Sequence, residues 1–481
     1  MGVADYFVFV VYFIAMLGVG LYFTRRNKSS SDYFVGGRSM GAGHVGLSVV
    51  ATDVGGGFSI GLGGLGFTMG LSGSWMLLTG LVGAWLSAVF LIPKVAGLGR
   101  AKNLLTFPQF LGEFYNARVV AAAAWISAIG YIGFTSSQML AGAKLASATF
   151  DQLDLTTALL FMGVIAVVYT VLGGIKAVIY TDTVQWILLM SGLVFIGIPL
   201  GYKAIGGWSA IEVTLGPSFL SLGNVTWQQL VNWGVTIVPI WFVGMTLYQR
   251  IFACRSAQEA RKAWFVAGLF EWPVMAFMGV ALGLFSRVAL ETGMFATLGH
   301  GDAAGFDAEM GLPLLLRSIL PTGLLGLMMS AYFSAIMSTA DSCLMAASGN
   351  VVTDLLPRSV ARLSSASKRW NVLRLSQLAT LLIGVLALAL ATRMQNVLEL
   401  MLYSYAFMVS GLFVPVLMAL FGRKPSSSAA LVAMVGGGAT TLALIAADVA
   451  LPLGLDANLF GIAASAMLYF TMKKIDDGTK P

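Results

Sequence analysis

The sequence contains few of the residues on which several classes of protein depend. In 481 residues there are two Cys and two His, and charged residues make up only 10%. Two Cys cannot supply a disulfide framework, and His44 and His300 lie too far apart to indicate a metal centre. The longest hydrophilic stretches are loops of about twenty residues, too short for a catalytic module beside the apolar segments. We therefore expect no catalytic residues and no enzyme activity.

Apolar residues, by contrast, are abundant. They make up 58% of the chain, and the mean hydropathy of +0.86 excludes an ordinary soluble domain. We predict an all-α integral membrane protein that forms a single transmembrane domain over residues 1–481. Runs of about 20 apolar residues predict about thirteen membrane spans, at 5–24, 42–70, 73–99, 118–149, 155–175, 177–205, 226–250, 263–290, 323–353, 373–392, 396–421, 428–450 and 457–473.

The basic residues indicate the orientation of the chain. If the N-terminus is outside, most of the 28 Lys and Arg residues fall in cytoplasmic segments, and Arg250 is counted among them. This bias accounts for the net charge of +7 without a nucleic-acid partner. Because MGVADYF lacks a basic n-region, we expect the first apolar run to be retained as a span. The prediction is a multi-pass protein of the plasma (inner) membrane, with the N-terminus outside and the C-terminus cytoplasmic.

Two predicted spans contain interruptions. The second includes Gly55, Gly56 and Gly57 in succession, which have poor helix propensity, and the seventh includes Pro239, which has no backbone N–H. Interrupted spans at corresponding places in two halves indicate a transporter site, whereas glycines alone also serve close helix packing. We predict a 5+5 inverted-repeat core, with repeats at 42–205 and 226–421, an extra N-terminal helix at 5–24 and two C-terminal helices within 428–473.

A polar stripe interrupts the apolar ninth span, where Ser334 begins the stretch SAIMSTADS. Four of its residues are spaced i, i+3, i+4 and i+7 on one helical face, namely Ala335, Ser338, Thr339 and Ser342, and Asp341 borders them. Hydroxyls with a carboxylate suit a hard cation that takes oxygen ligands. Single hydroxyls in such helices often bond only to the backbone one turn back, but the clustered set favours a site for Na+.

Three carboxylates lie where they could join this site. Asp53 precedes the glycine run, Asp182 begins or lies just inside the sixth span, and Asp341 borders the stripe. We expect no basic residue at comparable depth except Lys144, so bound cations would offset the carboxylates. The alternatives are helix capping by Asp53 and an interfacial position for Asp182. For Glu271, a packing hydrogen bond is favoured over a proton site.

Five motifs follow one another along nearly the whole chain. They read DYFVGGRSM from Asp32, ATDVGGG from Ala51, YTVLGGIKAVIYTDTVQ from Tyr169, YQR from Tyr248 and AIMSTADS from Ala335. Together these motifs resemble the sodium/solute symporter family, which has the leucine-transporter-like architecture. The resemblance implies secondary active transport by alternating access, with Na+ as the coupling ion.

The resemblance also implies particular site residues. The Na+ site would lie between the second and ninth spans, with the backbone oxygens of Ala51, Val54 and Ala335 and the hydroxyls of Ser338 and Thr339. A second Na+ site of some members matches Asp182, Ser338, Asp341 and Ser342, with Asp341 in place of a hydroxyl of some relatives. The solute would bind near mid-membrane between Asp53, Gly55, Gly56, Gly57, Phe58, Ser137, Gln138, Trp241 and Phe242.

The motifs leave the solute open. ATDVGGG shares its Asp with proline permeases, while VGGG and MSTADS are similar to the choline-transporter branch. Choline recognition requires an aromatic cage, and Asp53 stands where choline transporters have a Trp. We therefore expect a small zwitterion or carboxylate, with proline as the first compound to test. Choline, pantothenate, short monocarboxylates and sugars are alternatives, as is a proton-coupled permease. The expected partners are the solute, Na+ and the lipid bilayer, and the sequence does not indicate an oligomeric state.

Overall fold

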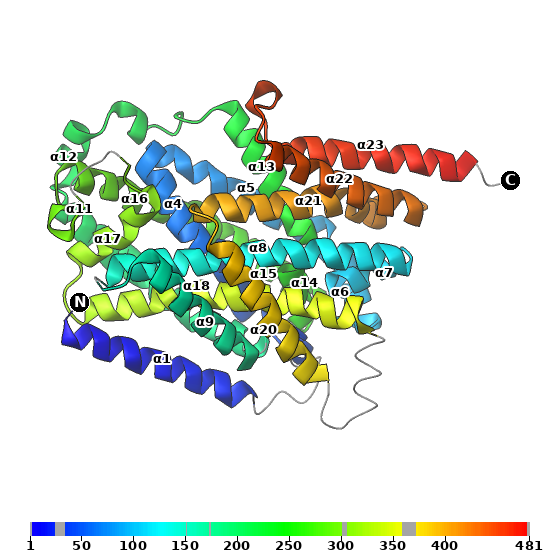
Figure 1. Ribbon diagram of the computed structural model, residues 1–481, viewed down its shortest axis with the longest axis horizontal. Helices are drawn as coiled ribbons and strands as arrows, with labels where there is room; N and C mark the ends of the chain where they lie inside the picture. The colour runs from blue at the N-terminus through cyan, green and yellow to red at the C-terminus, as the bar shows by residue number, and fades with distance from the viewer. Residues whose placement is uncertain are drawn as a thin grey trace.

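The computed structural model describes residues 2–24, 34–150, 152–172, 175–300, 305–357 and 372–478. Within these ranges the chain is helical, and the β contact found there is one isolated bridge between Met40 and Cys254. Most of the long helices lie side by side along the long axis of the molecule (Figure 1), and the two termini lie toward opposite ends of that axis.

The helices up to residue 214 include one adjoining pair that is interrupted at Gly55. They are α1 (Val3–Thr24), α3 (Ala42–Val54), α4 (Gly56–Met69), α5 (Trp75–Phe90), α6 (Ile92–Ala101), α7 (Phe107–Gly112), α8 (Ala117–Thr149), α9 (Leu155–Leu172), α10 (Ile175–Gly192), α11 (Ile198–Ala204) and α12 (Gly207–Thr214).

The helices after residue 214 follow the same pattern of long elements and interruptions. They are α13 (Trp227–Val243), α14 (Met245–Ala253), α15 (Ala257–Leu269), α16 (Ala276–Glu291), α17 (Gly311–Ile319), α18 (Leu324–Gly349), α20 (Val372–Ala391), α21 (Val397–Phe421), α22 (Ser427–Ala447) and α23 (Ala457–Gly478). Wider π-type turns continue α10, α15 and α18 as η3 (Leu193–Gly197), η5 (Phe270–Met275) and η8 (Asn350–Leu355).

Each of the predicted spans coincides with a helix or with an adjoining pair of helices. The range 42–70, for example, corresponds to α3 and α4, and the range 226–250 corresponds to α13 and α14. By length and composition, seven helices of the described chain are able to cross a membrane, or eight if the bent pair α13–α14 is one span. The all-helical membrane fold is thus confirmed, while the count of thirteen spans stays a prediction.

The predicted interruption of the second span is confirmed at Gly55. This residue lies between α3 and α4 with φ 8° and ψ −165°, and its N–H donates to the carbonyl oxygen of Ala51. A Cβ atom at Gly55 would lie 2.3 Å from Oγ1 of Thr339 on α18. Glycine therefore permits the close approach of α18 to the break.

The seventh span also bends, but not at the proline that predicted the bend. Pro239 lies inside α13, and the 43° bend falls at Gly244, which has extended backbone between α13 and α14. The Tyr131 side chain of α8 stabilises the bend, because its hydroxyl oxygen accepts from the N–H of Thr246 over 3.1 Å. A tertiary contact thus satisfies a donor that the bend leaves without a helical partner.

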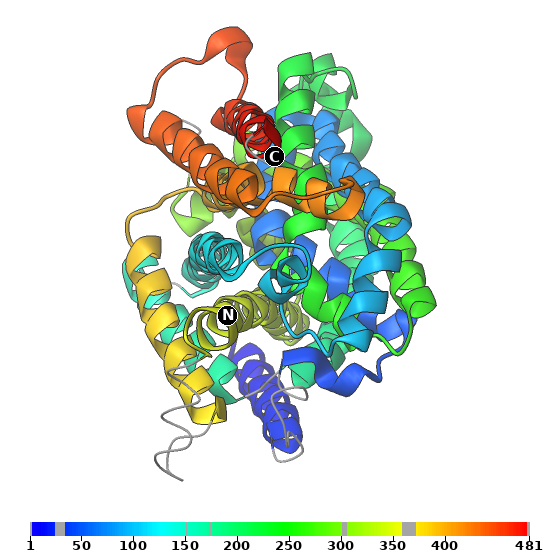
Figure 2. The same cartoon turned by 90° about the vertical axis from the view of Figure 1, so that its right-hand side faces the viewer.

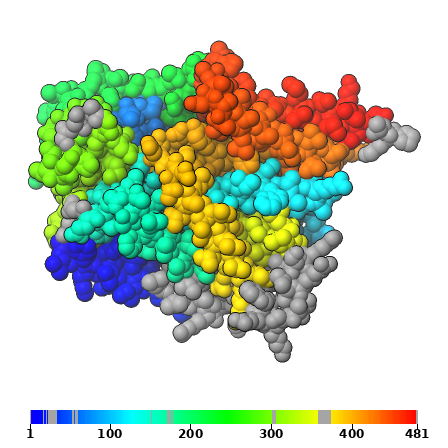
Figure 3. All heavy atoms as spheres, viewed as in Figure 1, coloured from blue at the N-terminus to red at the C-terminus, as the bar shows by residue number. Residues whose placement is uncertain are grey.

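Helices α8 and α18 lie in the interior of the bundle. Figure 2 shows them in cyan and yellow-green near the middle, with α1, α20 and α22 on the periphery. Nearly all residues of α18 are buried, whereas α20 exposes Leu381, Leu382, Val385 and Leu386. The outer face of the molecule in Figure 3 shows α20 lying across α8 and α9, which it contacts. This outward band of leucine and valine is what contact with lipid tails requires.

Candidate functional site

The break in α3–α4 and the polar stripe of α18 face each other in the structure. The Thr339 hydroxyl donates to the carbonyl oxygens of Ala51, at 3.1 Å, and of Ala335, at 3.2 Å. The carbonyl of Ala51 also accepts from the N–H of Gly55 at 3.0 Å, so this oxygen has two donors at the end of α3. Three of the five oxygens predicted for the Na+ site therefore meet at one point between the two elements.

The other two predicted ligands lie beside this point. Ser338 precedes Thr339 on α18, and its hydroxyl donates to Oδ1 of Asp182 on α10. Val54 is the last residue of α3, and its side chain lies outside the described part of the chain, as do those of Asp53 and Phe58. The burial of Gly56 and Gly57 is likewise outside it. Carbonyl and hydroxyl oxygens without thiolate or imidazole form a donor set that suits a hard cation such as Na+.

A small cavity adjoins the same oxygens. Its volume is about 20 Å³, and it is lined by Ala51, Gly55 and Ala335 together with residues of α10 and η5, among them Gln185 and Trp186. Space of this size holds about one water molecule or one ion. Two of the residues predicted to supply Na+ ligands, Ala51 and Ala335, therefore border a space of about the size of one ion, whose lining is otherwise mostly apolar.

Asp182 is neutralised by a cation that the sequence prediction did not include. The guanidinium of Arg250 on α14 lies 3.2 Å from Oδ2 of Asp182, and both side chains are fully buried. The expectation that Lys144 alone is basic at this depth is therefore wrong. Arg250 lies on α14, which begins directly after the bend at Gly244, and its side chain is buried inside the bundle.

Hydroxyl groups from two helices, α3 and α18, complete the environment of Arg250. Its Nε donates to Ser48 over 3.0 Å and its Nη2 donates to Ser342 over 3.0 Å and to Thr52, while the Ser48 hydroxyl donates to Oδ2 of Asp182. Ser48 and Thr52 stand one helical turn apart on α3, a spacing that was visible in the sequence as a signal of a polar face. The network connects α3, α10, α14 and α18.

The residues predicted for a second Na+ site are only partly brought together. Asp182 bonds to Ser338, and Ser342 bonds to Arg250, so these three side chains share one network. Asp341 instead accepts a hydrogen bond from Thr170 of α9. Its Oδ2 is buried and has no hydrogen-bond partner within the described ranges. Because consecutive helical residues point about 100° apart, Asp341 and Ser342 serve different faces of α18.

The residues predicted to contact the solute fall into two groups. On α8, the Ser137 hydroxyl donates to the carbonyl of Phe134 at 2.7 Å, and the Gln138 amide donates to Ser137 at 3.3 Å, both side chains being fully buried. On α13, Trp241 packs against Trp264 of α15, with ring centroids 6.3 Å apart, and Phe242 packs against Phe413 of α21. Trp241 therefore contributes to the packing of α13 against α15.

Lys144 and Glu309 form a second buried ion pair, which the sequence reading did not identify. Lys144 Nζ lies 2.6 Å from Glu309, in η7 (Ala308–Met310), and 2.6 Å from the more exposed Asp307. The Glu309 carboxylate also accepts from the backbone N–H groups of Val397 and Leu398 at the start of α21. A carboxylate at a helix N-terminus is favoured by the helix dipole. This contact ties α8, η7 and α21 together.

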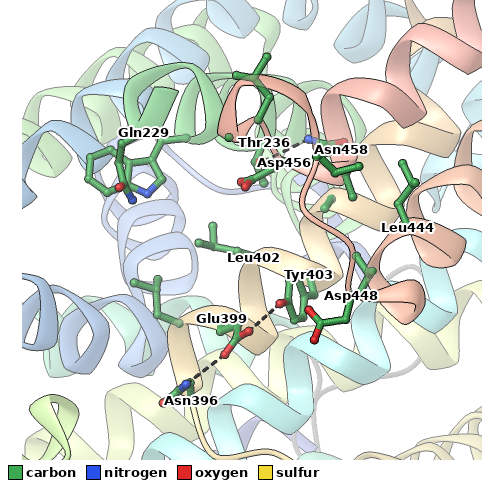
Figure 4. Close-up of a pocket in the computed structure, with 18 of the residues that line it drawn as sticks. Gln229, Thr236, Asn396, Glu399, Leu402, Tyr403, Leu444, Asp448, Asp456 and Asn458 are labelled. Carbon is green, nitrogen blue, oxygen red and sulfur yellow. Dashed lines mark hydrogen bonds between the residues drawn. The ribbon is translucent and has the colours of Figure 1, made fainter. Parts of the chain in front are cut away.

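Figure 4 shows a further cavity, and none of the residues that line it is a predicted Na+ ligand. Its volume is about 630 Å³, and it lies between α13, α21 and the segment that joins α22 to α23. Glu399, Asp448 and Asp456 line it together with Tyr403, whose hydroxyl donates to Glu399 at 2.6 Å. Asn458 borders the cavity and donates to Thr236.

A helical membrane bundle with an interrupted helix beside a polar stripe is typical of transporters. The model of the sodium:solute symporter family matches residues 33–437, and the chain belongs to this family. It is a multi-pass membrane protein from a family of Na+-coupled symporters, and its role is transport rather than catalysis. The five motifs noted in the sequence thus indicated the correct family.

Several relatives support this assignment. The chain is 28% identical to the high-affinity proline transporter of Bacillus subtilis, over 95% of this chain and 94% of the relative. It is 28% identical to the sodium/proline symporter of Escherichia coli (90% and 86%) and 27% identical to the sodium/glucose cotransporter of Vibrio parahaemolyticus (90% and 83%). Among solved structures, a Na+-coupled sialic acid symporter in a substrate-bound outward-open state matches with a TM-score of 0.79 and 21% identity, over 98% of both chains. This match supports the fold.

Proposed function

We propose that the chain couples inward movement of Na+ to uptake of a small organic solute by alternating access, and that proline is the first solute to test. The observation that carries the proposal is the meeting of Thr339 with the carbonyl of Ala51 at the break between α3 and α4. The contact depends on the relative position of α3 and α18. A cation held there stabilises one arrangement of the bundle over another, which is the linkage that coupling requires.

The proposed ion site uses backbone oxygens of Ala51, Val54 and Ala335 and hydroxyl oxygens of Ser338 and Thr339. In the described contacts the Thr339 hydroxyl donates to two of these carbonyls. When Na+ binds, this hydroxyl turns its lone pairs toward the ion and the same carbonyls become ligands. Each Na+ that moves through the full membrane potential contributes about 2.3 kcal/mol per 100 mV.

For the second ion site we propose that Arg250 supplies the positive charge. Its guanidinium already contacts Asp182 and Ser342, two of the predicted ligands. A second Na+ at Asp182 and Ser338 would then lie beside a fixed cation, at a Coulomb cost of several kcal/mol at an effective dielectric constant of about 20. We therefore expect one Na+ per solute.

We propose a membrane layout of thirteen spans with a 5+5 inverted-repeat core, the N-terminus outside and the C-terminus in the cytoplasm, in the plasma or inner membrane. In support, each predicted range coincides with helical structure, and each proposed repeat has a helix break in its first span, at Gly55 and at Gly244. The termini lie toward opposite ends of the bundle (Figure 1), as an odd number of spans requires.

The solute is proposed from the relatives and from the residues between the two breaks. Relatives that transport proline and glucose are similarly distant, at 28% and 27% identity. We propose that the solute binds between the α3–α4 break, α8 and α13. The residues are Asp53, Gly55, Gly56, Gly57 and Phe58 at the break, Ser137 and Gln138 on α8, and Phe242 on α13, with Trp241 supporting that part of the site. A small zwitterion fits an environment of amide, hydroxyl and one carboxylate. Short monocarboxylates, choline and pantothenate are the alternatives.

Uptake into proteoliposomes tests the proposal. With Na+ outside and K+ inside, we expect labelled proline to accumulate, and we expect no accumulation when K+ replaces Na+ on both sides. A panel that includes glucose, lactate, pantothenate and choline separates the solute classes. Accumulation driven by a pH gradient in the absence of Na+ would instead establish a proton-coupled permease and would overturn the proposed ion site.

A further inference from the structure

Helix α10 presents two polar side chains toward α18, one turn apart. Asp182 belongs to the network around Arg250, and Gln185 stands three residues later, which places it on the same side of the helix. Gln185 borders the small cavity that Ala51 and Ala335 also line. The amide therefore lies at the edge of the proposed Na+ site without being one of the predicted ligands.

The amide oxygen of Gln185 has no hydrogen-bond partner within the described ranges, although the side chain is only 3% exposed. Its Nε2 contacts the sulfur of Met16 on α1 at 3.5 Å, which leaves the oxygen as the unsatisfied end. Burying an amide oxygen without a hydrogen-bond partner destabilises a fold by roughly 1–3 kcal/mol. A bound ion or water would offset this cost.

The cavity has the size that such a ligand requires. About 20 Å³ accommodates one ion or one ion-bound water and nothing larger. Gln185 borders the cavity together with Ala51 and Ala335, the residues that carry the ion-site carbonyls, and the rest of the lining is mostly apolar. We propose that the amide oxygen of Gln185 is a further oxygen ligand of the Na+ site, reached across this cavity. This inference rests on the proposed function, because it adds a ligand to the proposed ion site.

Such a ligand connects the ion to a third element of the bundle. An ion bound by the ligands on α3 and α18 would hold the helix break against the polar stripe. A bond from Gln185 to the same ion would connect α10 to these two helices. Asp182 already joins α10 to Ser338 through a hydrogen bond. Loss of the Gln185 oxygen is therefore expected to weaken Na+ binding while the helices stay joined through Asp182.

Direct binding of ²²Na+ to the purified full-length chain in detergent tests the inference without relying on transport. Gln185→Met keeps the length of the side chain and removes the amide, and we expect its dissociation constant for Na+ to rise by about fivefold to tenfold. Gln185→Glu keeps an oxygen in the same place, and we expect it to bind Na+ at least as tightly as the unmodified chain. This second variant shows whether a loss of binding reflects a missing ligand or a damaged fold.

Asn458→Leu is the matched control, because Asn458 on α23 is also a fully buried amide with an unpartnered oxygen, away from the ion site. We expect its Na+ affinity to equal that of the unmodified chain. Gln185→Met with unchanged affinity would overturn the role of Gln185 and leave the proposed function intact. An unmodified chain that binds no ²²Na+ would overturn both.

Discussion

At the scale of single residues, the site combines two kinds of oxygen. Thr339 meets backbone carbonyls, whereas Ser338 is engaged with a carboxylate that Arg250 already neutralises. The two neighbouring hydroxyls are therefore not equivalent, although they look alike in the sequence. Removing the Thr339 hydroxyl is expected to change the ion site alone. Removing the Ser338 hydroxyl is expected to change the charge network of Asp182 and Arg250 as well.

Thr339→Ala tests the first role. The substitution deletes the oxygen that bridges α3 and α18, so we expect the Na+ concentration for half-maximal uptake to rise about tenfold with little change in thermal stability, because the network of Asp182 is untouched. Ser338→Ala should raise the same concentration and also lower the melting temperature. Uptake measured against Na+ concentration, with melting followed in detergent, separates the two. Unchanged Na+ dependence in both variants would remove the site assignment.

Arg250 and Asp182 are expected to behave as one unit. Breaking a buried ion pair leaves an uncompensated charge at a cost of about 3–5 kcal/mol, whereas removing both partners is far less costly. We expect Arg250→Met and Asp182→Asn each to lower the melting temperature strongly, and the double variant to recover most of the loss. A double variant as unstable as the two single effects added together would show that the groups act independently.

At the scale of elements, the helix break and α18 form one contact. Gly55 has no Cβ, and this absence allows Thr339 to approach the end of α3. The bend at Gly244 has a corresponding role for α14. Arg250 lies on the helix that follows the bend, and its side chain contacts Ser48 of α3 and Asp182 of α10. Both breaks thus place polar groups at one level of the bundle, and the sequence alone located only the first of them correctly.

Gly55→Ala tests this contact. The added methyl would lie 2.3 Å from the Thr339 hydroxyl, so α3 and α18 must separate and Na+-dependent uptake should fall at least about tenfold. Gly43→Ala is the control, because a Cβ atom at Gly43, also on α3, meets nothing within 4 Å. Uptake assays on both variants at matched expression check the prediction. Equal loss in both would point to a general effect of glycine replacement in α3.

The end of α18 carries a pH-sensitive contact with α7. Asp354, in η8 beyond the predicted span, accepts hydrogen bonds from Thr106 and Gln109 at 3.0 and 3.1 Å, and burial raises the pKa of Asp354 to about 7. Because the folded chain then holds this proton more tightly than the unfolded chain, stability should decrease as the pH rises from about 4 to about 7. Asp354→Asn should flatten that decrease in melting curves. An unaltered slope would exclude Asp354 as its source.

At the scale of the whole molecule, the sequence predicted the helical ranges and the family but not the charge balance. Apolar runs determine where helices lie, and glycine at a break has a local conformational cause, so both can be read along the chain. Arg250 and Glu309 could not be placed in this way, because their partners Asp182 and Lys144 are 68 and 165 residues distant. Which face of α18 Asp341 occupies likewise depends on the packing of α9. Long-range pairing is decided by tertiary structure rather than by local pattern.

That charge balance determines how steeply the transporter can concentrate its solute. If Arg250 replaces a second Na+, one ion moves per neutral solute, and a tenfold Na+ gradient with 100 mV supplies about 3.7 kcal/mol, or about 500-fold accumulation. Two ions would double the free energy and allow about 10⁵-fold accumulation. We therefore expect proteoliposomes under these gradients to reach a plateau near 500-fold, with a Hill coefficient for Na+ near 1 that Asp341→Asn does not change. A plateau well above 500-fold would show that a second cation binds despite the fixed charge of Arg250.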